Sequence, residues 1–493
     1  MNIDFFLSGL MYDPKNPMLF QSVLFFGVFS IFYLIYSFFN NEIKVRNALL
    51  LAFSLFFYYK ISGGFVLALI FMASVDYLVA RNLPRAKSER KKILLLSLSL
   101  FINVGGLLFF KYTYFFLDVY NSVSGSTVSL AMKIIQPIGI SYFVFKSLGY
   151  VLDVKREMIE EPEKNYANYL LYVSFFPNIL AGPISKARDL LPKFKENSVV
   201  DKKIINAAVF IIIIGLIKKI AIADYLAANM VGRVFESPQF FSGVDLFMAC
   251  YGGLIQLFFD FSGYTDIVVG LALLMGFQIK GNFNQPFKAK NITDFWRRWH
   301  ISLYEWLSEY IYQPLAFIWR KQKLLGTLMA VIITFLISGI WHGPNWVFII
   351  WGSLHGLMIC WDVLTSKYRS KLATLGGKYY SFFSVFLTFH FIVFSAVLLK
   401  SPSFNYTIDY YSQLLTTFDP KMLIKWFEIY SWPFGVMIIG LALQFLPLNF
   451  YSKLENGFVK TPLILSSIIL VIIIFSLYQL SYMEAMPFLY IVY

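Results

Sequence analysis

The chain has 493 residues, of which 58% are hydrophobic, 19% are aromatic and only 14% are charged. A soluble domain averages about 25% charged residues, so this composition excludes an ordinary soluble protein and indicates a polytopic membrane protein. The formal net charge of +14 does not indicate nucleic-acid binding, because the basic residues gather between apolar stretches. The two cysteines, Cys250 and Cys360, have the spacing of neither a disulfide framework nor a metal site.

Apolar stretches long enough to cross a bilayer, or nearly so, recur along the whole sequence. They predict an all-α fold, in which one integral membrane domain, residues 1–493, forms a transmembrane helical bundle with about 11–12 spans plus re-entrant and interfacial helices. The stretches are 17–39, 45–59, 62–80, 93–117, 134–152, 204–231, 244–275, 324–341, 346–365, 379–399, 432–448 and 462–482.

The distribution of basic residues predicts how these spans are oriented. If Met1 lies outside, most of the 42 Lys and Arg residues fall in connections on the cytoplasmic side. This is the positive-inside pattern, and it predicts that both termini are extracytoplasmic. The densest basic cluster, at 81–92, is interpreted as a topology signal beside anionic lipid headgroups rather than as a ligand site. The first 17 residues lack a basic region before an apolar core, so no cleaved signal peptide is expected.

The stretch from Tyr169 to Pro183 has to begin and end on the cytoplasmic side for this orientation to hold. Its second part, Phe175–Pro183, contains two prolines and a glycine, so a continuous helix is not expected. One interpretation is a re-entrant segment, and broken backbone at membrane depth is tolerated only where protein or a water-filled cavity satisfies it. A kinked interfacial segment explains the same residues equally well.

Two carboxylates, Asp260 and Asp266, interrupt the otherwise apolar stretch 244–275. Because they are six residues apart, they face different ways on a straight helix, and paired acid–base chemistry is not indicated. Each is expected to hold an arginine, a backbone amide or the orientation of a histidine.

A basic region, 281–323, follows. From Asn291 its apolar residues recur at three- and four-residue steps. This period predicts an amphipathic helix that begins at Asn291 or Thr293, stops at Pro314, and lies in the interface or dips into the bundle.

The predicted amphipathic helix carries His300, one of only four histidines in the chain. Taken alone, His300 is explained somewhat better by packing than by function. Arg297 and Arg298 could meet the phosphates of a donor molecule, or they could anchor the helix to lipid headgroups. The residues leave both alternatives open.

His342 is the most informative residue of the sequence. It lies between apolar runs that extend from Leu324 to Ile340 and from Trp346 to Trp361. An ionisable side chain in such a place is costly to bury and is a functional-site hypothesis by default, whereas a hydrogen-bonded core histidine is the structural alternative. His355 and His390 also lie in apolar segments, and both are interpreted as structural because spacing indicates no partner for them.

Several motifs follow one another between residues 175 and 356. They are Phe175-Phe176-Pro177 with Ala181-Gly182-Pro183, Phe259-Asp260-Phe261-Ser262-Gly263-Tyr264, Asn282-Phe283-Asn284-Gln285-Pro286-Phe287, Asp294-Phe295-Trp296-Arg297-Arg298-Trp299-His300-Ile301-Ser302-Leu303 and Gly339-Ile340-Trp341-His342-Gly343. Together, and in this order, they resemble the membrane-bound O-acyltransferase family, and most closely its bacterial branch of alginate O-acetylation proteins and teichoic acid D-alanine exporters. After Leu315 the alginate type continues with a glycine-rich, basic turn, which this chain lacks, so the modified glycan and the partner stay open.

The resemblance implies a bundle with a funnel on each face, and a catalytic core at 130–370 between peripheral helices at 1–129 and 371–493. It assigns catalytic roles to His342 and His300, with no bound cofactor and no metal. Further side chains are expected to line the donor path or the cavity: Asp260, Arg297, Arg298, Trp299, Trp341 and Asn345.

The resemblance also implies the substrates and partners. An acyl-CoA such as acetyl-CoA, or an acyl-carrier thioester, would approach from the cytoplasm, and a hydroxyl acceptor would approach from outside. The expected partners are membrane lipids, an extracytoplasmic acyltransferase and a polysaccharide acceptor, with no nucleic acid. The expected location is the bacterial cytoplasmic (inner) membrane.

The chemistry of the residues agrees with this reaction class. Acyl transfer from a thioester to a hydroxyl needs a base for the hydroxyl proton and a site that excludes water, and a histidine kept neutral by desolvation can be that base. The sequence has neither a Gly-x-Ser-x-Gly elbow nor a phosphate-binding loop, which argues against a serine hydrolase or an ATPase. We therefore expect a membrane O-acyltransferase that moves an acyl group to an exported or cell-surface polysaccharide, and we expect this acyl group to be acetyl. A carrier or flippase for a lipid-linked glycan is the competing class, and a scaffold for secretion machinery is a third.

Overall fold

The computed structural model describes residues 10–14, 17–131, 133–197 and 199–480. All regular elements within these ranges are helices and none is a strand, which confirms the predicted all-α class. The predicted extracytoplasmic ends of the chain fall on residues outside these ranges.

The described helices belong to two compact units, and each unit is treated by itself. Unit 1 comprises Met1–Ala208 and Ile267–Lys280, and unit 2 comprises Val209–Asp266 and Gly281–Tyr493. The predicted division into a core at 130–370 and peripheral helices within a single membrane domain stays a prediction.

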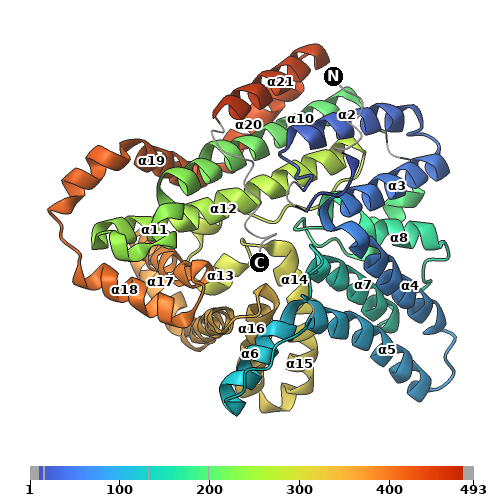
Figure 1. The fold of residues 1–493 in the computed structure, drawn as a ribbon, viewed down its shortest axis with the longest axis horizontal. Coiled ribbons are helices and arrows are strands. Elements are labelled where there is room, and N and C mark those ends of the chain that lie inside the picture. The colour runs from blue at the N-terminus through green and yellow to red at the C-terminus, as the bar shows by residue number, and fades with distance from the viewer. Residues whose placement is uncertain (1–9, 15–16, 132, 198, 481–493) are drawn as a thin grey trace. The chain divides into compact units, whose positions relative to one another are not determined.

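Unit 1 contains the helices from α2 to α9 and the first part of α10 (Figure 1). Phe176 lies at the centre of its aromatic core, where its ring centroid is 4.9 Å from that of Phe53 and 5.7 Å from that of Phe57. The helices are α2 (Val23–Phe38), α3 (Ile43–Ser62), α4 (Val66–Asn82), α5 (Glu89–Leu107), α6 (Thr113–Ser124), α7 (Ile140–Lys155), α8 (Tyr166–Ser174), α9 (Ala187–Leu190) and α10 (Lys202–Leu216), with short helical turns at Gly63–Phe65, Leu108–Tyr112, Phe176–Asn178 and Pro192–Lys195.

Unit 2 contains the remaining helices, including most of the long α12. They are α11 (Gly232–Glu236), α12 (Gly243–Leu274), α13 (Ile292–Trp296), α14 (Ile301–Leu307), α15 (Gln313–Ile318), α16 (Leu324–His342), α17 (Trp346–Lys400), α18 (Phe404–Thr416), α19 (Met422–Phe445), α20 (Leu448–Val459) and α21 (Leu463–Leu480), with π-helical segments at Ile217–Asp224, Ala227–Val231 and Ser308–Tyr312 and 3₁₀ turns at Pro238–Phe240, Pro286–Lys288 and Arg320–Gln322.

Within the described residues, seven helical segments are long and apolar enough to cross a membrane, or up to eight if the bent pair α20 and α21 forms one span. The chain is therefore a multi-pass membrane protein, as predicted. The count is lower than the number of apolar stretches because two segments, Ile43–Asn82 and Trp346–Lys400, each hold two of them. In addition, α2 and α7 have only 16 residues each.

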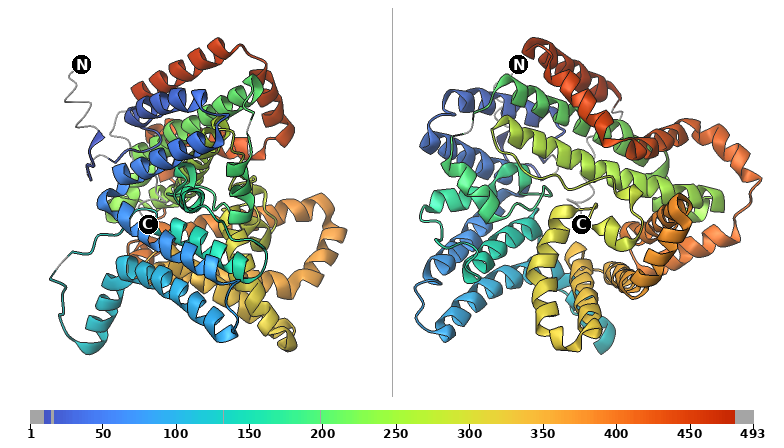
Figure 2. Two further views of the ribbon diagram at one scale, coloured as in Figure 1. Left: turned by 90° about the vertical axis from the view of Figure 1, so that its right-hand side faces the viewer. Right: turned by 180° about the vertical axis from the view of Figure 1, so that it is seen from behind.

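The longest of these segments, α17, folds back on itself. A straight helix would place residues 40 positions apart at a distance of about 60 Å. The ring of His355 nevertheless lies 3.2 Å from the hydroxyl of Ser395, 40 residues later. The reversal occurs at Gly377, whose φ of 49° is non-helical and suits a residue without Cβ (Figure 2). Helix α17 therefore consists of two packed helical arms, although Figure 1 gives both arms a single label.

The prediction of one continuous amphipathic helix from Asn291 is wrong, because the helix is broken between Trp296 and Ile301. Asn291 caps its start, because its side chain accepts a hydrogen bond from the backbone of Asp294 at 2.8 Å. The chain then breaks after α13, and His300 adopts a left-handed conformation with φ of 46° before α14 begins. Pro314 does not end the helix, because the chain stays helical from Ile301 through the π-helical segment Ser308–Tyr312 to Ile318.

The predicted break after Tyr169 is confirmed within unit 1. Helix α8 ends at Ser174, a single 3₁₀ turn covers Phe176–Asn178, and the residues that follow up to Lys186 are not helical. All side chains from Phe175 to Ile184 are buried. Protein therefore surrounds this irregular backbone, while its relation to the membrane stays a prediction.

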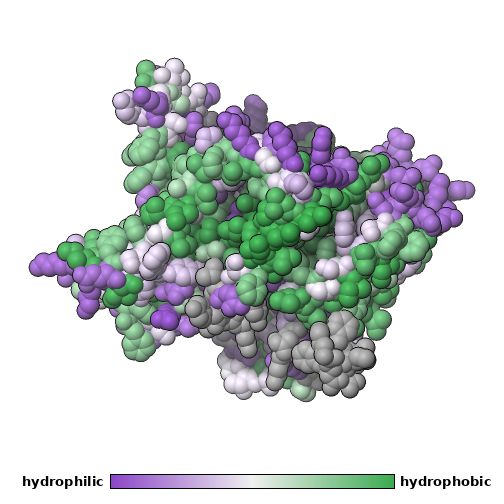
Figure 3. Space-filling model, turned by 90° about the horizontal axis from the view of Figure 1, so that it is seen from above, coloured by the Kyte–Doolittle hydropathy of each residue, from purple (hydrophilic) through white to green (hydrophobic). Residues whose placement is uncertain are grey.

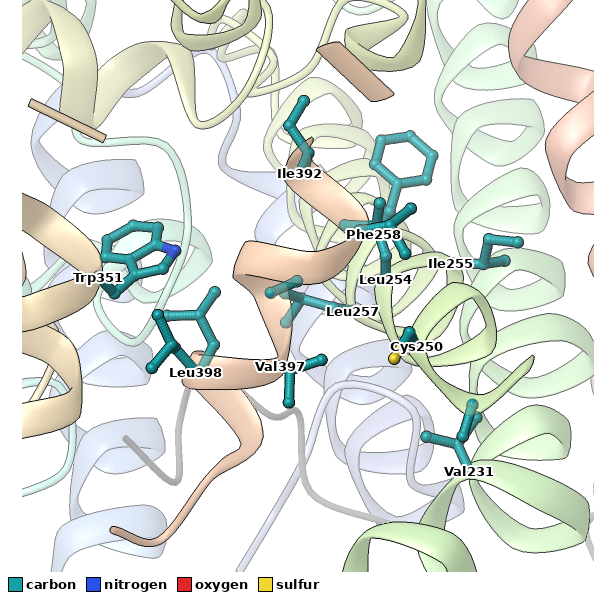
Figure 4. Close-up of a cluster of buried hydrophobic side chains, with 14 of the residues drawn as sticks. Val231, Cys250, Leu254, Ile255, Leu257, Phe258, Trp351, Ile392, Val397 and Leu398 are labelled. Carbon is teal, nitrogen blue, oxygen red and sulfur yellow. The ribbon is translucent and has the colours of Figure 1, made fainter. Parts of the chain in front are cut away.

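The core of unit 2 joins α12 to the second arm of α17. Figure 4 shows Leu254 and Leu257 of α12 in the same cluster as Ile392 and Val397 of α17. Apolar side chains are also abundant at the surface, and they cover much of the face shown in Figure 3. Large exposed apolar surfaces are expected where lipid replaces water.

Candidate functional site

The candidate site lies where α16 crosses the first arm of α17 in unit 2. Two glycines allow the backbones to meet, since a Cβ on Gly339 would lie 2.4 Å from the carbonyl oxygen of Phe348, and a Cβ on Gly352 would lie 2.4 Å from that of Phe335. Small residues at helix crossings in membranes permit this close approach. The crossing fixes the last turn of α16 against α17.

His342 is the last residue of α16 and is buried. Its ring centroid lies 5.0 Å from that of Trp341 and 4.9 Å from that of Trp351, with the Trp351 indole at 89° to the imidazole. The imidazole is thus held in an aromatic environment. At the end of a helix, the partial negative charge of the C-terminal carbonyl groups stabilises any positive charge that forms on such a side chain.

His300 is fully buried in the break between α13 and α14. Its left-handed backbone is a conformation that histidine adopts more readily than most residues. The ring contacts Phe261 of α12, with centroids 4.8 Å apart at 80°. Burial lowers the pKa of His300 to about 3, so the imidazole is neutral at physiological pH. Its place at the N-terminal end of α14 also disfavours a positive charge.

A single indole joins the two histidines. The ring of Trp341 lies 5.0 Å from His342 and 6.2 Å from His300. The two residues predicted to be catalytic are 42 positions apart in sequence, and the structure brings them to the same buried tryptophan.

Asp260, a predicted lining residue, is buried in an ion pair. Its carboxylate accepts from the ammonium group of Lys219 at 2.6 Å, and the same ammonium lies 2.8 Å from Asp224. The second carboxylate of this stretch, Asp266, pairs with Lys218 at 2.6 Å. Both carboxylates thus have a lysine partner, which the expectation of an arginine, a backbone amide or a histidine did not include.

The other predicted lining residues have different surroundings. Trp299 packs in the aromatic core beside Phe283 at 5.2 Å. Arg298 is partly buried, and its Nε donates to Asp294 at 2.8 Å. Arg297 is exposed. Asn345 caps α17, accepting from the backbone of Val347 at 3.1 Å. Among the ring contacts described for these residues, those of Trp341 reach both histidine rings.

A third histidine, His355, contacts the same indole, Trp351, as His342 does. Its ring centroid is 4.8 Å from that of Trp351, the indole that also contacts His342. The Nε1 of Trp296 donates to Nδ1 of His355 at 3.2 Å, and Nε2 of His355 lies 3.2 Å from Ser395 Oγ. Sequence reasoning left His355 without a partner. Its spacing of four residues from Trp351 was the available signal, because such residues share a helix face.

The arrangement can perform proton transfer in a site that excludes water. A buried imidazole at a helix C-terminus can take a proton, and the surrounding indoles remove competing solvent. Among the described residues, no group of three or more His, Cys, Asp or Glu side chains could hold a metal ion.

Comparisons with known proteins agree with the motifs. The sequence model of the membrane-bound O-acyltransferase family matches residues 160–401. A peptidoglycan O-acetyltransferase of Helicobacter pylori is 35% identical over 353 residues, which cover 66% of this chain and 66% of that protein. A protein of Pseudomonas syringae pv. tomato named as an alginate O-acetylase is 33% identical over 375 residues, which cover 73% of this chain and 68% of that protein.

A more distant relative has a different named acyl group. The teichoic acid D-alanyltransferase of Bacillus subtilis is 30% identical over 287 residues, covering 56% of this chain and 71% of that protein. The chain spans slightly less than two thirds of the Helicobacter protein, at 66%, and 62% of a second alginate O-acetylase, from Azotobacter vinelandii.

Proposed function

Because the chain belongs to the membrane-bound O-acyltransferase family, we propose that it transfers an acyl group from a thioester to a hydroxyl group, with His342 as the general base. The observation that carries this proposal is the buried imidazole at the end of α16, between the indoles of Trp341 and Trp351.

The proposed reaction balances without a metal or a redox partner. His342 takes the proton of the acceptor hydroxyl as its oxygen attacks the thioester carbonyl carbon. A C–O bond forms, the C–S bond breaks, and the leaving thiolate receives the proton from the imidazolium. The products are an ester and a thiol. The C-terminal end of α16 favours His342 in its transient charged form.

His300 has a different role in this proposal. It is neutral, fully buried and at the N-terminal end of α14, so it is poorly suited to hold a positive charge. A neutral imidazole can instead donate a hydrogen bond to a carbonyl oxygen as negative charge develops there. His300 would thus orient the donor or stabilise its carbonyl, while His342 takes the proton.

The substrate class follows from the relatives. Their names specify O-acetylation of peptidoglycan and alginate and D-alanylation of teichoic acid, which are all polymers of the cell envelope. We therefore assign to this chain the transfer of acetyl, from acetyl-CoA or an acyl-carrier thioester on the cytoplasmic side, to hydroxyl groups of an extracytoplasmic polysaccharide. The bacterial inner membrane, extracytoplasmic termini and a partner acyltransferase belong to the same proposal.

The test is transfer of a labelled acetyl group from a thioester, in vesicles that contain the purified chain and a polysaccharide acceptor. Replacing His342 with Ala should lower transfer by roughly 100-fold to 10,000-fold, the range for a general base. His300→Asn keeps a residue that tolerates positive φ and should cost less. His390→Ala is the matched control, because Nδ1 of His390 lies within hydrogen-bond distance of the carbonyl of Phe386 one turn earlier and its ring contacts Tyr251 rather than either proposed site histidine.

Two results would contradict the proposal. Near-normal transfer by the His342→Ala chain would exclude His342 as base. Movement of a lipid-linked glycan across the vesicle membrane, with no ester formed by the unmodified chain, would establish the carrier function instead.

A further inference from the structure

The hydrogen bonds of His355 define its tautomer. An indole N–H is only a donor, so Nδ1 of His355, which receives the bond from Trp296, carries no proton. The remaining proton is therefore on Nε2, which donates to the hydroxyl of Ser395. Ser395 in turn donates to the carbonyl oxygen of Ile392 at 3.1 Å. Every donor in this chain of bonds has an acceptor.

The same bonds keep His355 uncharged. A second proton on Nδ1 would place an N–H group against the N–H group of Trp296, and the bond between them would be lost. The described partners of the ring, from α13 and from both arms of α17, are Trp296, Trp351, Phe391 and Ser395. None of these side chains titrates near neutral pH.

His355 also supports the indole that faces the proposed base. The Trp351 indole contacts the rings of both histidines. Its centroid lies 4.9 Å from that of His342 and 4.8 Å from that of His355. Trp296, the donor to His355, contacts the same indole at 5.6 Å and 71°. All four rings are buried. A shift of His355 would therefore be passed through a packed indole to His342.

We propose that His355 is a positioning residue for acyl transfer: fixed as the neutral Nε2–H tautomer between Trp296 and Ser395, it holds the Trp351 indole against which the His342 imidazole rests. This inference rests on the proposed function of His342. It gives His355 no proton to carry, in contrast to His342.

The test compares two replacements of His355 by measuring kcat and KM for acetyl transfer. Glutamine has an acceptor and donors on one side chain, so His355→Gln can retain both bonds and should transfer within about threefold of the parent. His355→Leu removes both bonds and should lower kcat by about 10-fold to 100-fold with donor KM nearly unchanged, because a misplacement of about 1 Å can cost a factor of that size. His390→Leu, on the second arm of α17, should behave as the parent.

A second measurement follows the tautomer itself. In chain labelled with ¹⁵N-histidine, nuclear magnetic resonance should show His355 as the Nε2–H form at pH 6 to 8, identified by its loss in His355→Gln. In Trp296→Phe, which lacks the donor, this fixed tautomer should give way to a mixture, and kcat should fall without a matching rise in donor KM. If His355→Leu does not fold, kcat of Trp296→Phe tests the positioning role of His355 in its place.

Each other outcome has a definite meaning. Parent-like kcat in both His355→Leu and Trp296→Phe, or a proton found on Nδ1 of His355, would overturn the positioning role while leaving the proposed function intact. Transfer by His355→Gln as low as that of His342→Ala would show that His355 exchanges protons itself, which also overturns it. An unmodified chain that transfers no acetyl group would overturn the proposed function, and the positioning role with it.

Discussion

Two neighbouring lysines form ion pairs of the same length in very different surroundings. Lys219 and Asp260 are 2.6 Å apart, with side chains 1% and 3% exposed. Lys218 and Asp266 are also 2.6 Å apart, with side chains 21% and 27% exposed. The comparison therefore separates the effect of burial from the effect of distance.

The loss of stability should depend on burial. Lys219→Met removes the ammonium group, keeps most of the side-chain volume and leaves the Asp260 carboxylate buried without that partner. Breaking a buried pair in this way costs about 3–5 kcal/mol. Lys218→Met breaks a pair that water reaches, for which the loss is about 0–1 kcal/mol. Asp224, 2.8 Å from Lys219 and 22% exposed, retains some contact with solvent and should contribute less to the loss.

Unfolding in detergent can be followed through the two free cysteines, Cys250 and Cys360, which are buried and react with a thiol dye only when the protein opens. Lys219→Met should react far sooner on heating than Lys218→Met. The double variant Lys219→Met with Asp260→Leu should recover most of the loss, since it leaves no uncompensated charge at that pair. Equal stability of the two single variants would refute the argument from burial.

Three further outcomes follow from the structure. Gly339→Ala should cost about 1–3 kcal/mol and reduce transfer, because its Cβ meets backbone at 2.4 Å; Gly435→Ala, with nothing within 4 Å, is the control in the same unfolding assay. Burial holds the pKa of His300 at about 3, below the ordinary value of about 6.5. Unfolding midpoints should therefore be constant above about pH 7 and fall as pH drops below 6.5, and His300→Asn should weaken that dependence. Arg298→Glu should raise the donor KM in inside-out vesicles at low salt, and a donor consumed only from the extracytoplasmic face would contradict the predicted orientation.

Sequence reasoning singled out His342 because an ionisable residue in an apolar run is visible without a structure, whereas His300 was assigned through the family resemblance, and both catalytic roles stay predictions. It also predicted the broken segment after Tyr169, since proline and glycine act locally. It missed the break at His300. The spacing of apolar residues stays helical across this position and therefore does not indicate that one residue has a left-handed backbone. The prediction therefore ran one continuous helix through the break between Trp296 and Ile301, and it stopped at Pro314 although the helical conformation continues to Ile318.

Contacts between side chains that are far apart in the sequence could not be predicted in this way. Lys219 and Asp260 are 41 residues apart, and Trp296 and His355 are 59 residues apart. Neither spacing has a local periodicity that could indicate contact. The reversal of α17 at Gly377 brings Ser395 to His355, and one glycine in a long helical sequence does not by itself predict a reversal.

The placement of the two histidines limits the path of the proton. They meet the same indole, Trp341, and an indole N–H can donate a hydrogen bond but cannot accept a proton. Trp341 itself therefore cannot carry a proton from one imidazole to the other. In the proposed reaction, the proton that His342 takes at the end of a helix that stabilises positive charge returns to the leaving thiolate, so that acyl transfer and proton return are completed at one histidine.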